Sequence, residues 1–376
     1  MSKERAFSIP VDLIRTVAIV GVILLHSAND LTSQQMNWFE IIRWNTVTVY
    51  QSIGRLGVPL FLLLTGALLL QPSKLTEPIG VFFRKRLDRI GLPFIFWGAI
   101  YFAWDFLVVN KINNQPITTT SIIQGILTGP YYQFWYLYLL LGLYLITPIL
   151  RVVMANASRD LIKYILILWF LGAAIVPTIA LVTPLHLDTN VLTITGYVGY
   201  FILGAYLLTV QISRSKLALY TAVGITLTAI GTYVIAATVG GTEMYFFQGY
   251  LSPTLILAAC SLFLLLIAFR SPSAQTFAPL ASHGNNLNLK EICSEGPCTS
   301  KGSKLLRLIS VNTLPLYMFH VMVLETIQYG YLGFAINGNK INSVIGVPLN
   351  TVIVLFVSLG IIVGLKKVPG LKKLVG

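Results

Sequence analysis

Residues 12–30 read DLIRTVAIVGVILLHSAND, an apolar run that also carries Asp12, Arg15 and His26. A helix of about 20 apolar residues is long enough to cross the hydrocarbon core of a bilayer. Ionisable groups inside such a helix are costly, and they mark functional sites when they face the interior of a bundle. The stretch therefore predicts a first membrane span with a polar stripe.

The composition of the whole chain is that of a helical membrane protein. Of its 376 residues, 56% are hydrophobic and only 10% are charged, and the mean hydropathy is +0.78. The apolar stretches are continuous, whereas a β-barrel would show short alternating segments. We predict an all-α fold, a polytopic transmembrane helical bundle forming a single domain over residues 1–376, in the cell membrane. About ten spans are expected, at residues 9–29, 50–71, 90–110, 132–153, 161–182, 195–211, 217–238, 250–270, 308–329 and 347–365.

The net charge of +13 is distributed unevenly along the chain. Of the 26 Lys and Arg residues, 21 fall in segments on one side of the predicted bilayer. Only Arg43, Arg55, Lys111 and Lys340 fall on the other side. Because positive loops stay in the cytoplasm, both termini are predicted to be cytoplasmic. The charge is thus a signal of topology, and no nucleic-acid partner is expected.

Residues 271–305 interrupt the apolar pattern and are rich in Ser, Gly and Asn, so we expect a polar cytoplasmic insertion there. Cys293 and Cys298 lie within it, and a structural disulfide is disfavoured in the cytoplasm. With His283 their spacing matches no zinc pattern, so no metal site is predicted.

Helical geometry aligns the polar groups of the first span. Arg15 and His26 are eleven residues apart, which places them about 20° apart around an α-helix and about 16 Å apart along it. Asp12 lies about 60° away on the same side. Taken singly, Arg15 is explained at least as well by snorkelling to the interface as by a functional site. The same holds for His26 and its place at the outer end of a span. Their alignment favours a site, with Arg15 near the cytoplasm and His26 near the outer surface.

A basic cluster precedes the third span, in the stretch FFRKRLDRIGLPFIFW at residues 82–97. Arg86 and Arg89 are three residues apart and would be neighbours on one helical face. Two guanidinium groups at that spacing suit bidentate binding of a phosphate. The alternative is a cluster that sets topology beside anionic lipid.

The stretch DLIRTVAIVGVILLHS at residues 12–27 resembles the opening motif of the acyltransferase 3 family. Members of this family are integral-membrane enzymes that acylate sugars, and in their first span an Arg is followed eleven residues later by a His. Further stretches that resemble the family are GRLGVPLFLLLTGALLL at 54–70, RKRLDRIGLPFIFW at 84–97 with its Arg-x-x-Arg, FWYLYLLLGLYLITPIL at 134–150 and NTLPLYMFH at 312–320. The resemblance covers nearly the whole chain, and it implies a ten-span layout.

The resemblance also implies a donor and an acceptor. The donor is acyl-CoA, most often acetyl-CoA, arriving from the cytoplasm as a co-substrate, with no permanently bound cofactor. The acceptor is a carbohydrate on the far side. Arg15, Arg86 and Arg89 would bind the donor phosphates, with Asp12 orienting or neutralising Arg15.

His26 is the predicted catalytic residue, acting as general base on a sugar hydroxyl or forming a transient acyl-histidine. His320, in the middle of the ninth span, and Glu325, nearer the outer face, are further candidates. They stand about 140° apart on their helix, which does not suit a side-by-side dyad.

Two alternatives remain open at this level. Outer aromatic residues at 37–45 and 130–138 suit sugar stacking but also an interfacial belt, which is the more common reason for them. The alternative function for a ten-span bundle with buried charges is a transporter of a glycan or acylated metabolite. Transporters often contain internal repeats, and the two halves of this chain show no convincing similarity.

Overall fold

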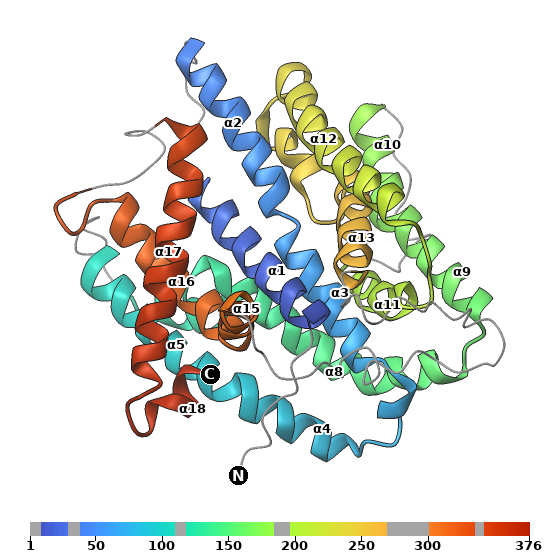
Figure 1. Cartoon of the computed structure of the whole chain (residues 1–376), viewed down its shortest axis with the longest axis horizontal. Coiled ribbons are helices and arrows are strands. Elements are labelled where there is room, and N and C mark those ends of the chain that lie inside the picture. The colour runs from blue at the N-terminus through green and yellow to red at the C-terminus, as the bar shows by residue number, and fades with distance from the viewer. Residues whose placement is uncertain (1–8, 29–37, 110–117, 184–195, 269–300, 335–341) are drawn as a thin grey trace.

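The regular secondary structure is entirely helical in the part of the chain that the computed structural model describes, residues 9–28, 38–109, 118–183, 196–268, 301–334 and 342–376 (Figure 1). The predicted all-α class is thus confirmed. The helices are α1 (Ile9–Ser27), α2 (Trp38–Gly54), α3 (Gly57–Leu69), α4 (Ile79–Arg86), α5 (Leu92–Trp104), α7 (Thr119–Thr128), α8 (Trp135–Asn156), α9 (Arg159–Phe170), α10 (Val176–Val182), α11 (Val198–Leu207), α12 (Arg214–Thr238), α13 (Pro253–Ile267), α15 (Lys301–Val311), α16 (Thr313–Gln328), α17 (Ser343–Leu365) and α18 (Leu371–Val375).

Eight helical stretches within these described residues are long and apolar enough to cross a membrane, or nine if the bent pair α15–α16 forms one span. The predicted span at 195–211 corresponds to α11, a ten-residue helix that falls short of that length. The bundle is therefore confirmed as a membrane-spanning type, while the number ten and the orientation of the termini stay predictions.

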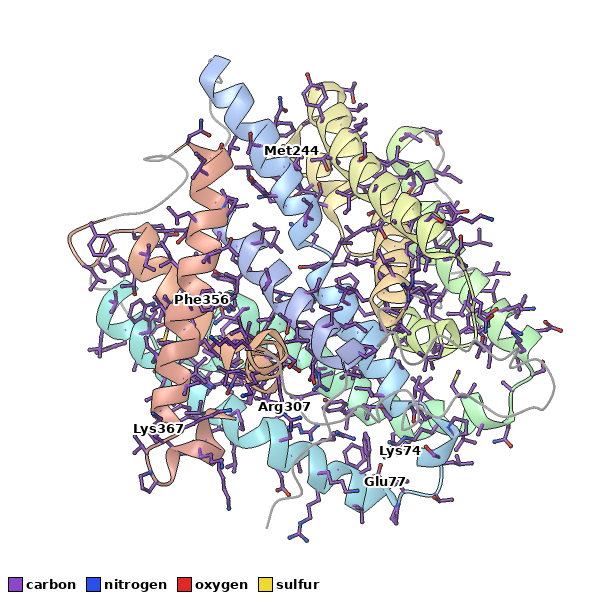
Figure 2. All side chains as sticks on the ribbon, viewed as in Figure 1. Lys74, Glu77, Met244, Arg307, Phe356 and Lys367 are labelled. Atoms are coloured by element: carbon purple, nitrogen blue, oxygen red, sulfur yellow. The ribbon has the colours of Figure 1, made fainter. Side chains whose placement is uncertain are left out.

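Most of the predicted polar insertion at 271–305 lies outside the described residues. Its last part is helical, because α15 begins at Lys301. At the lower end of the bundle in this view lie Lys74, Glu77 and Lys367, whereas Met244 lies toward the opposite end (Figure 2).

Helix α1 is the central element of the bundle and packs against α2, α3, α13, α15, α16 and α17 (Figure 1). Two glycines permit its close approach to the junction of α2 and α3. A Cβ atom on Gly54 would lie 2.7 Å from the backbone nitrogen of Leu25, and one on Gly57 would lie 2.5 Å from the carbonyl oxygen of Ala18. Small residues at such crossings let helix backbones approach closely in membranes.

Helices α15 and α16 meet at a bend of 79°. Pro315 lies in the first turn of α16 and has no N–H to donate to the carbonyl of Val311, so a straight continuation would lose a hydrogen bond there. The bend lets α15 pack beside the first half of α1, where Ser310 meets Asp12. It also lets α16 reach the other end of α1, where His320 meets His26.

Three π-helical turns interrupt the described helices, at Leu87–Gly91, Asp105–Val109 and Leu171–Ile175. Pro93 follows the first and Pro177 the third, each within two residues. A proline cannot donate the α-helical hydrogen bond to the preceding turn, and a widened turn accommodates that loss. The first π turn contains Arg89 of the predicted phosphate-binding pair.

Candidate active site

The last turn of α1 carries His26, and the structure brings it beside His320 of α16. The centroids of the two imidazole rings are 5.3 Å apart. The ring of Tyr132 lies 5.2 Å from His26 on its other side, and that of Tyr317 lies 5.9 Å from His320. We call His26 and His320 the histidine pair; its two members come from spans almost 300 residues apart in sequence.

The hydrogen bonds of His320 fix its tautomer. Its Nδ1 lies 2.8 Å from the carbonyl oxygen of Tyr317 and 3.1 Å from that of Leu316. Carbonyl oxygens only accept, so Nδ1 carries the proton and donates it. In the neutral ring Nε2 is then an acceptor, and this buried atom has no hydrogen-bond partner among the described residues. His320 thus offers a second proton-accepting nitrogen beside His26.

Glu325 is held by aromatic groups. The hydroxyl of Tyr131 donates to one carboxylate oxygen at 2.6 Å, and the indole N–H of Trp104 donates to the other at 3.2 Å. The side chain is buried, and no hydrogen bond joins it to His320 within the described structure. Glu325 therefore fixes the aromatic residues on the wall of the site.

The opposite half of α1 carries Asp12 and Arg15. Asp12 is buried and accepts a hydrogen bond from the hydroxyl of Ser310 on α15. Arg15 is half-buried. Arg15, Arg86 and Arg89 all lie within electrostatic range of the hydroxyl of Tyr144 in α8.

Of the predicted phosphate-binding residues, Arg86 lies over the ring of Tyr144. The guanidinium carbon of Arg86 lies 5.7 Å from the ring centroid of Tyr144 and 5.1 Å from that of Phe82. Arg86 is half-buried, and its Nε has no hydrogen-bond partner among the described residues, whereas Arg89 is exposed. We call Arg15, Arg86 and Arg89 the arginine cluster. The π turn Leu87–Gly91 begins directly after Arg86 and contains Arg89, so the α-helical spacing argument does not describe how the two side chains are related.

The comparison with family models identifies the family of the chain. Residues 10–366 match a family model described as an acyltransferase domain, the model of the acyltransferase 3 family. The chain belongs to the acyltransferase 3 family. A search of curated proteins and a search of solved structures gave no match. A membrane acyltransferase is the activity that the family supports.

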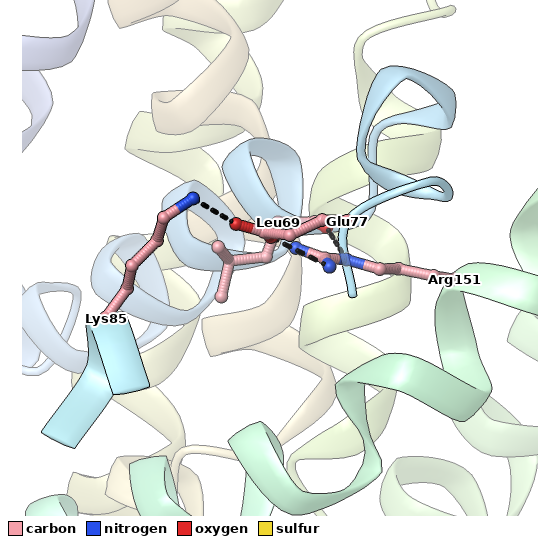
Figure 3. A network of polar contacts seen from close by, with 4 residues as sticks. All are labelled: Leu69, Glu77, Lys85 and Arg151. Atoms are coloured by element: carbon pink, nitrogen blue, oxygen red, sulfur yellow. Dashed lines mark hydrogen bonds and ion pairs between the residues drawn. The ribbon is translucent and has the colours of Figure 1, made fainter. Parts of the chain in front are cut away.

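This acyltransferase 3 chain also has a buried ion pair that sequence reasoning missed. Arg151 of α8 is only 4% exposed, and its Nη1 lies 3.1 Å from a carboxylate oxygen of Glu77 (Figure 3). Its Nε donates to the carbonyl of Leu69 at 2.8 Å, and its guanidinium carbon lies 4.6 Å from the ring centroid of Phe82. Lys85 donates to the other oxygen of Glu77 at 2.7 Å. Phe82 is thus shared between Arg151 and Arg86.

Electrostatics keep Glu77 ionised. Burial by itself would raise the pKa of Glu77, but the hydrogen bonds and charges of Lys85 and Arg151 outweigh that effect and hold the pKa below its ordinary value of 4.5. Sequence analysis counted Arg151 only as a topology signal. The available clue was its place directly after the apolar run that ends at Leu150.

No group of three or more metal-ligating side chains lies among the residues that the structure describes in this acyltransferase 3 protein. Cys293, Cys298 and His283, which were considered as metal ligands, lie outside those residues.

Proposed function

We propose that this protein is a membrane-bound O-acyltransferase that moves an acyl group, in the simplest case acetyl, from acyl-CoA at the cytoplasmic side to a hydroxyl of a cell-surface or lipid-linked sugar. The observation that carries the proposal is the division of α1. Its first half contributes Arg15 to the arginine cluster, and its last turn contributes His26 to the histidine pair. The rise from Arg15 to His26, about 16 Å, leaves room for a long, thin acyl-carrying arm between phosphates and reacting group.

The chemistry assigns one role to each end. The arginine cluster binds the phosphates of the donor, since guanidinium groups form charge-assisted hydrogen bonds to phosphate oxygens. Asp12 accepts a hydrogen bond from Ser310 and so holds the first turns of α1 against α15. His26 takes the proton from the sugar hydroxyl as that oxygen attacks the thioester carbonyl. The carbon–sulfur bond breaks, the thiolate of CoA leaves and takes up a proton, and a sugar ester forms.

In the covalent variant, a His26 nitrogen attacks the thioester carbonyl, the carbon–sulfur bond breaks and the thiolate of CoA leaves and takes up a proton; the acyl group then passes from His26 to the sugar oxygen. His320, with its unpartnered Nε2, then receives the proton of the hydroxyl. Label that appears on the parent protein but not on His26→Ala after incubation with labelled acetyl-CoA and no acceptor, and that hydroxylamine releases, distinguishes the covalent variant from direct transfer.

Transfer by reconstituted protein tests the proposal. Proteoliposomes receive labelled acetyl-CoA on the cytoplasmic side of the protein and envelope glycan on the other. His26→Ala should lower the rate of label transfer by about 10²–10⁴-fold, the usual contribution of a general base. Ser27→Ala is the matched control in the same helical turn, because it removes only a buried hydroxyl that makes no hydrogen bond among the described residues.

Full transfer by His26→Ala would refute the assignment of this histidine and leave His320→Ala as the next variant to test. A transporter gives another result: glycan crosses the bilayer and acquires no label, even in the parent protein.

A further inference from the structure

Arg55 lies between α2 and α3, inside the apolar stretch Trp44–Leu69, which is long and apolar enough to cross a membrane. Sequence analysis counted it among the outer charges, and the helix bounds place it within a candidate span. A cation at such a depth is costly in lipid, so its presence indicates a partner or a ligand. The close approach of Gly54 to Leu25 sets Arg55 level with the last turn of α1, and its charge acts on His26.

Arg55 has an aromatic neighbour but no counter-ion among the described residues. Its guanidinium carbon lies 5.4 Å from the ring centroid of Tyr250, and its side chain also interacts with the hydroxyl of that tyrosine. Nε is buried and has no hydrogen-bond partner there. No carboxylate that the structure describes lies within ion-pair distance of Arg55. The positive charge is therefore not neutralised by the part of the fold that is described.

Aromatic rings extend from Arg55 toward the histidine pair. Tyr250 stacks on Trp135, with centroids 5.6 Å apart and planes 24° apart. Trp135 starts α8, three residues after Tyr132, whose ring contacts that of His26. The wall between Arg55 and His26 thus has flat apolar faces of the kind that pack against a sugar ring.

Two buried amides lie on the same segments. Gln133, between Tyr132 and Trp135, is fully buried, and neither its side-chain oxygen nor its nitrogen has a hydrogen-bond partner among the described residues. The same holds for Gln248, 1% exposed and two residues before Tyr250. Buried polar groups are normally satisfied by protein, water or ligand. Sugar hydroxyls can both donate to and accept from amides, so they fit these groups.

We propose that Arg55, Tyr250, Trp135 and Gln133 form an acceptor subsite beside His26 for a sugar that carries an anionic group, either a carboxylate or a phosphate. The guanidinium binds the anion, the aromatic faces pack on the sugar ring, and Gln133 binds a hydroxyl. This rests on the proposed function, because it takes the histidine pair as the place of transfer. If Arg55 had only a structural role, it would hold the ring of Tyr250 in place, and acyl transfer would not depend on the charge of the acceptor.

The test compares charged and neutralised acceptors. Envelope glycan from the cells that make the protein is used intact, after carboxyl reduction with carbodiimide and borohydride, and after removal of phosphate with cold hydrofluoric acid. Parent protein, Arg55→Gln and Arg55→Lys are reconstituted at full length with labelled acetyl-CoA. Arg159→Gln is the matched control, because Arg159 also lies over a tyrosine ring, 5.9 Å from the centroid of Tyr206, but at an exposed position.

For the parent, one of the two neutralisations should lower label transfer at least tenfold, and its identity tells carboxylate from phosphate. Arg55→Gln should lower transfer to intact glycan by a similar factor and no longer distinguish the intact from the neutralised form. Arg55→Lys should restore part of the difference, and Arg159→Gln should behave as the parent. Equal transfer to all three glycans by the parent, or an equal loss on all three in Arg55→Gln, would overturn the proposal.

Direct binding separates this proposal from the proposed function. Purified parent and Arg55→Gln are titrated with the intact and the neutralised glycans, and separately with coenzyme A. Tighter binding of intact glycan by the parent alone supports the subsite even if no acyl transfer takes place, which would count against the function only. Indifference of the parent to neutralisation overturns the subsite even if transfer is rapid.

Discussion

Replacement of Arg151 by methionine should destabilise the protein far more than replacement of Lys85, although both side chains bind the same carboxylate. Arg151 is 4% exposed and Lys85 is 59% exposed. Arg151→Met leaves Glu77 without its buried partner and removes the hydrogen bond to the carbonyl of Leu69, in the last turn of α3 where carbonyls lack intrahelical donors.

The expected magnitudes follow from burial. Removal of one member of a fully buried ion pair costs about 3–5 kcal/mol, which is an upper range here because Glu77 is 12% exposed. The loss should lie near the lower value, because Lys85 still neutralises Glu77 at 2.7 Å. Methionine keeps part of the aliphatic stem over Phe82, so little packing is lost. Lys85→Met, at an exposed site, should cost at most about 1 kcal/mol.

Reversible unfolding in mixed micelles of detergent and dodecyl sulfate, followed by tryptophan fluorescence, gives the two free energies. Glu77→Gln should cost about as much as Arg151→Met, and the double variant should cost less than the sum, because the two side chains interact directly. Equal losses for Arg151→Met and Lys85→Met, or additive losses in the double variant, would refute the reasoning from burial.

Further outcomes are expected at the side that is predicted to be cytoplasmic. The double variant Arg86→Ala, Arg89→Ala should lose about 1.5–3 kcal/mol in coenzyme A affinity, roughly 10–150-fold, measured by titration calorimetry; unchanged affinity would leave these residues as topology signals. Because the pKa of Glu77 is lowered on folding, its stabilising effect should be complete above pH 4.5 and be lost as the pH falls through the folded pKa. Glu77→Gln should lack that part of the pH dependence of the melting temperature, and an identical profile would contradict the ion pair. A Ser300→Cys variant should resist impermeant thiol reagents on intact cells and react after lysis; rapid labelling from outside would invert the topology.

The first span was accurately predicted from sequence, at 9–29 against Ile9–Ser27. Its apolar length and its polar residues are local properties, and so is the angular alignment of Arg15 with His26. The mid-span position of His320 was also readable. Its contact with His26 was not, because it depends on the 79° bend between α15 and α16 and on packing across almost the whole chain.

Other features could not be predicted from the sequence by assuming a constant helical rotation per residue. The π turn at Leu87–Gly91 changes the relation of Arg86 to Arg89, which a constant rotation per residue does not anticipate. Arg151 and Arg55 were counted only as charges of one side or the other. Their surroundings come from residues distant in sequence, Glu77 for the first and Tyr250 for the second.

The central place of α1 has a consequence for biosynthesis. It leaves the ribosome before the other helices of the described bundle, and Ser310, which hydrogen-bonds Asp12, follows 298 residues later. At roughly 5–20 residues per second, about 15–60 s pass before that partner is made. During this interval Asp12, Arg15 and His26 have to be sheltered by the insertion machinery or by transient neighbours, since lipid does not solvate them. Substitutions at these three positions are therefore expected to change the efficiency of membrane insertion as well as catalysis, and yield has to be measured before rates are compared.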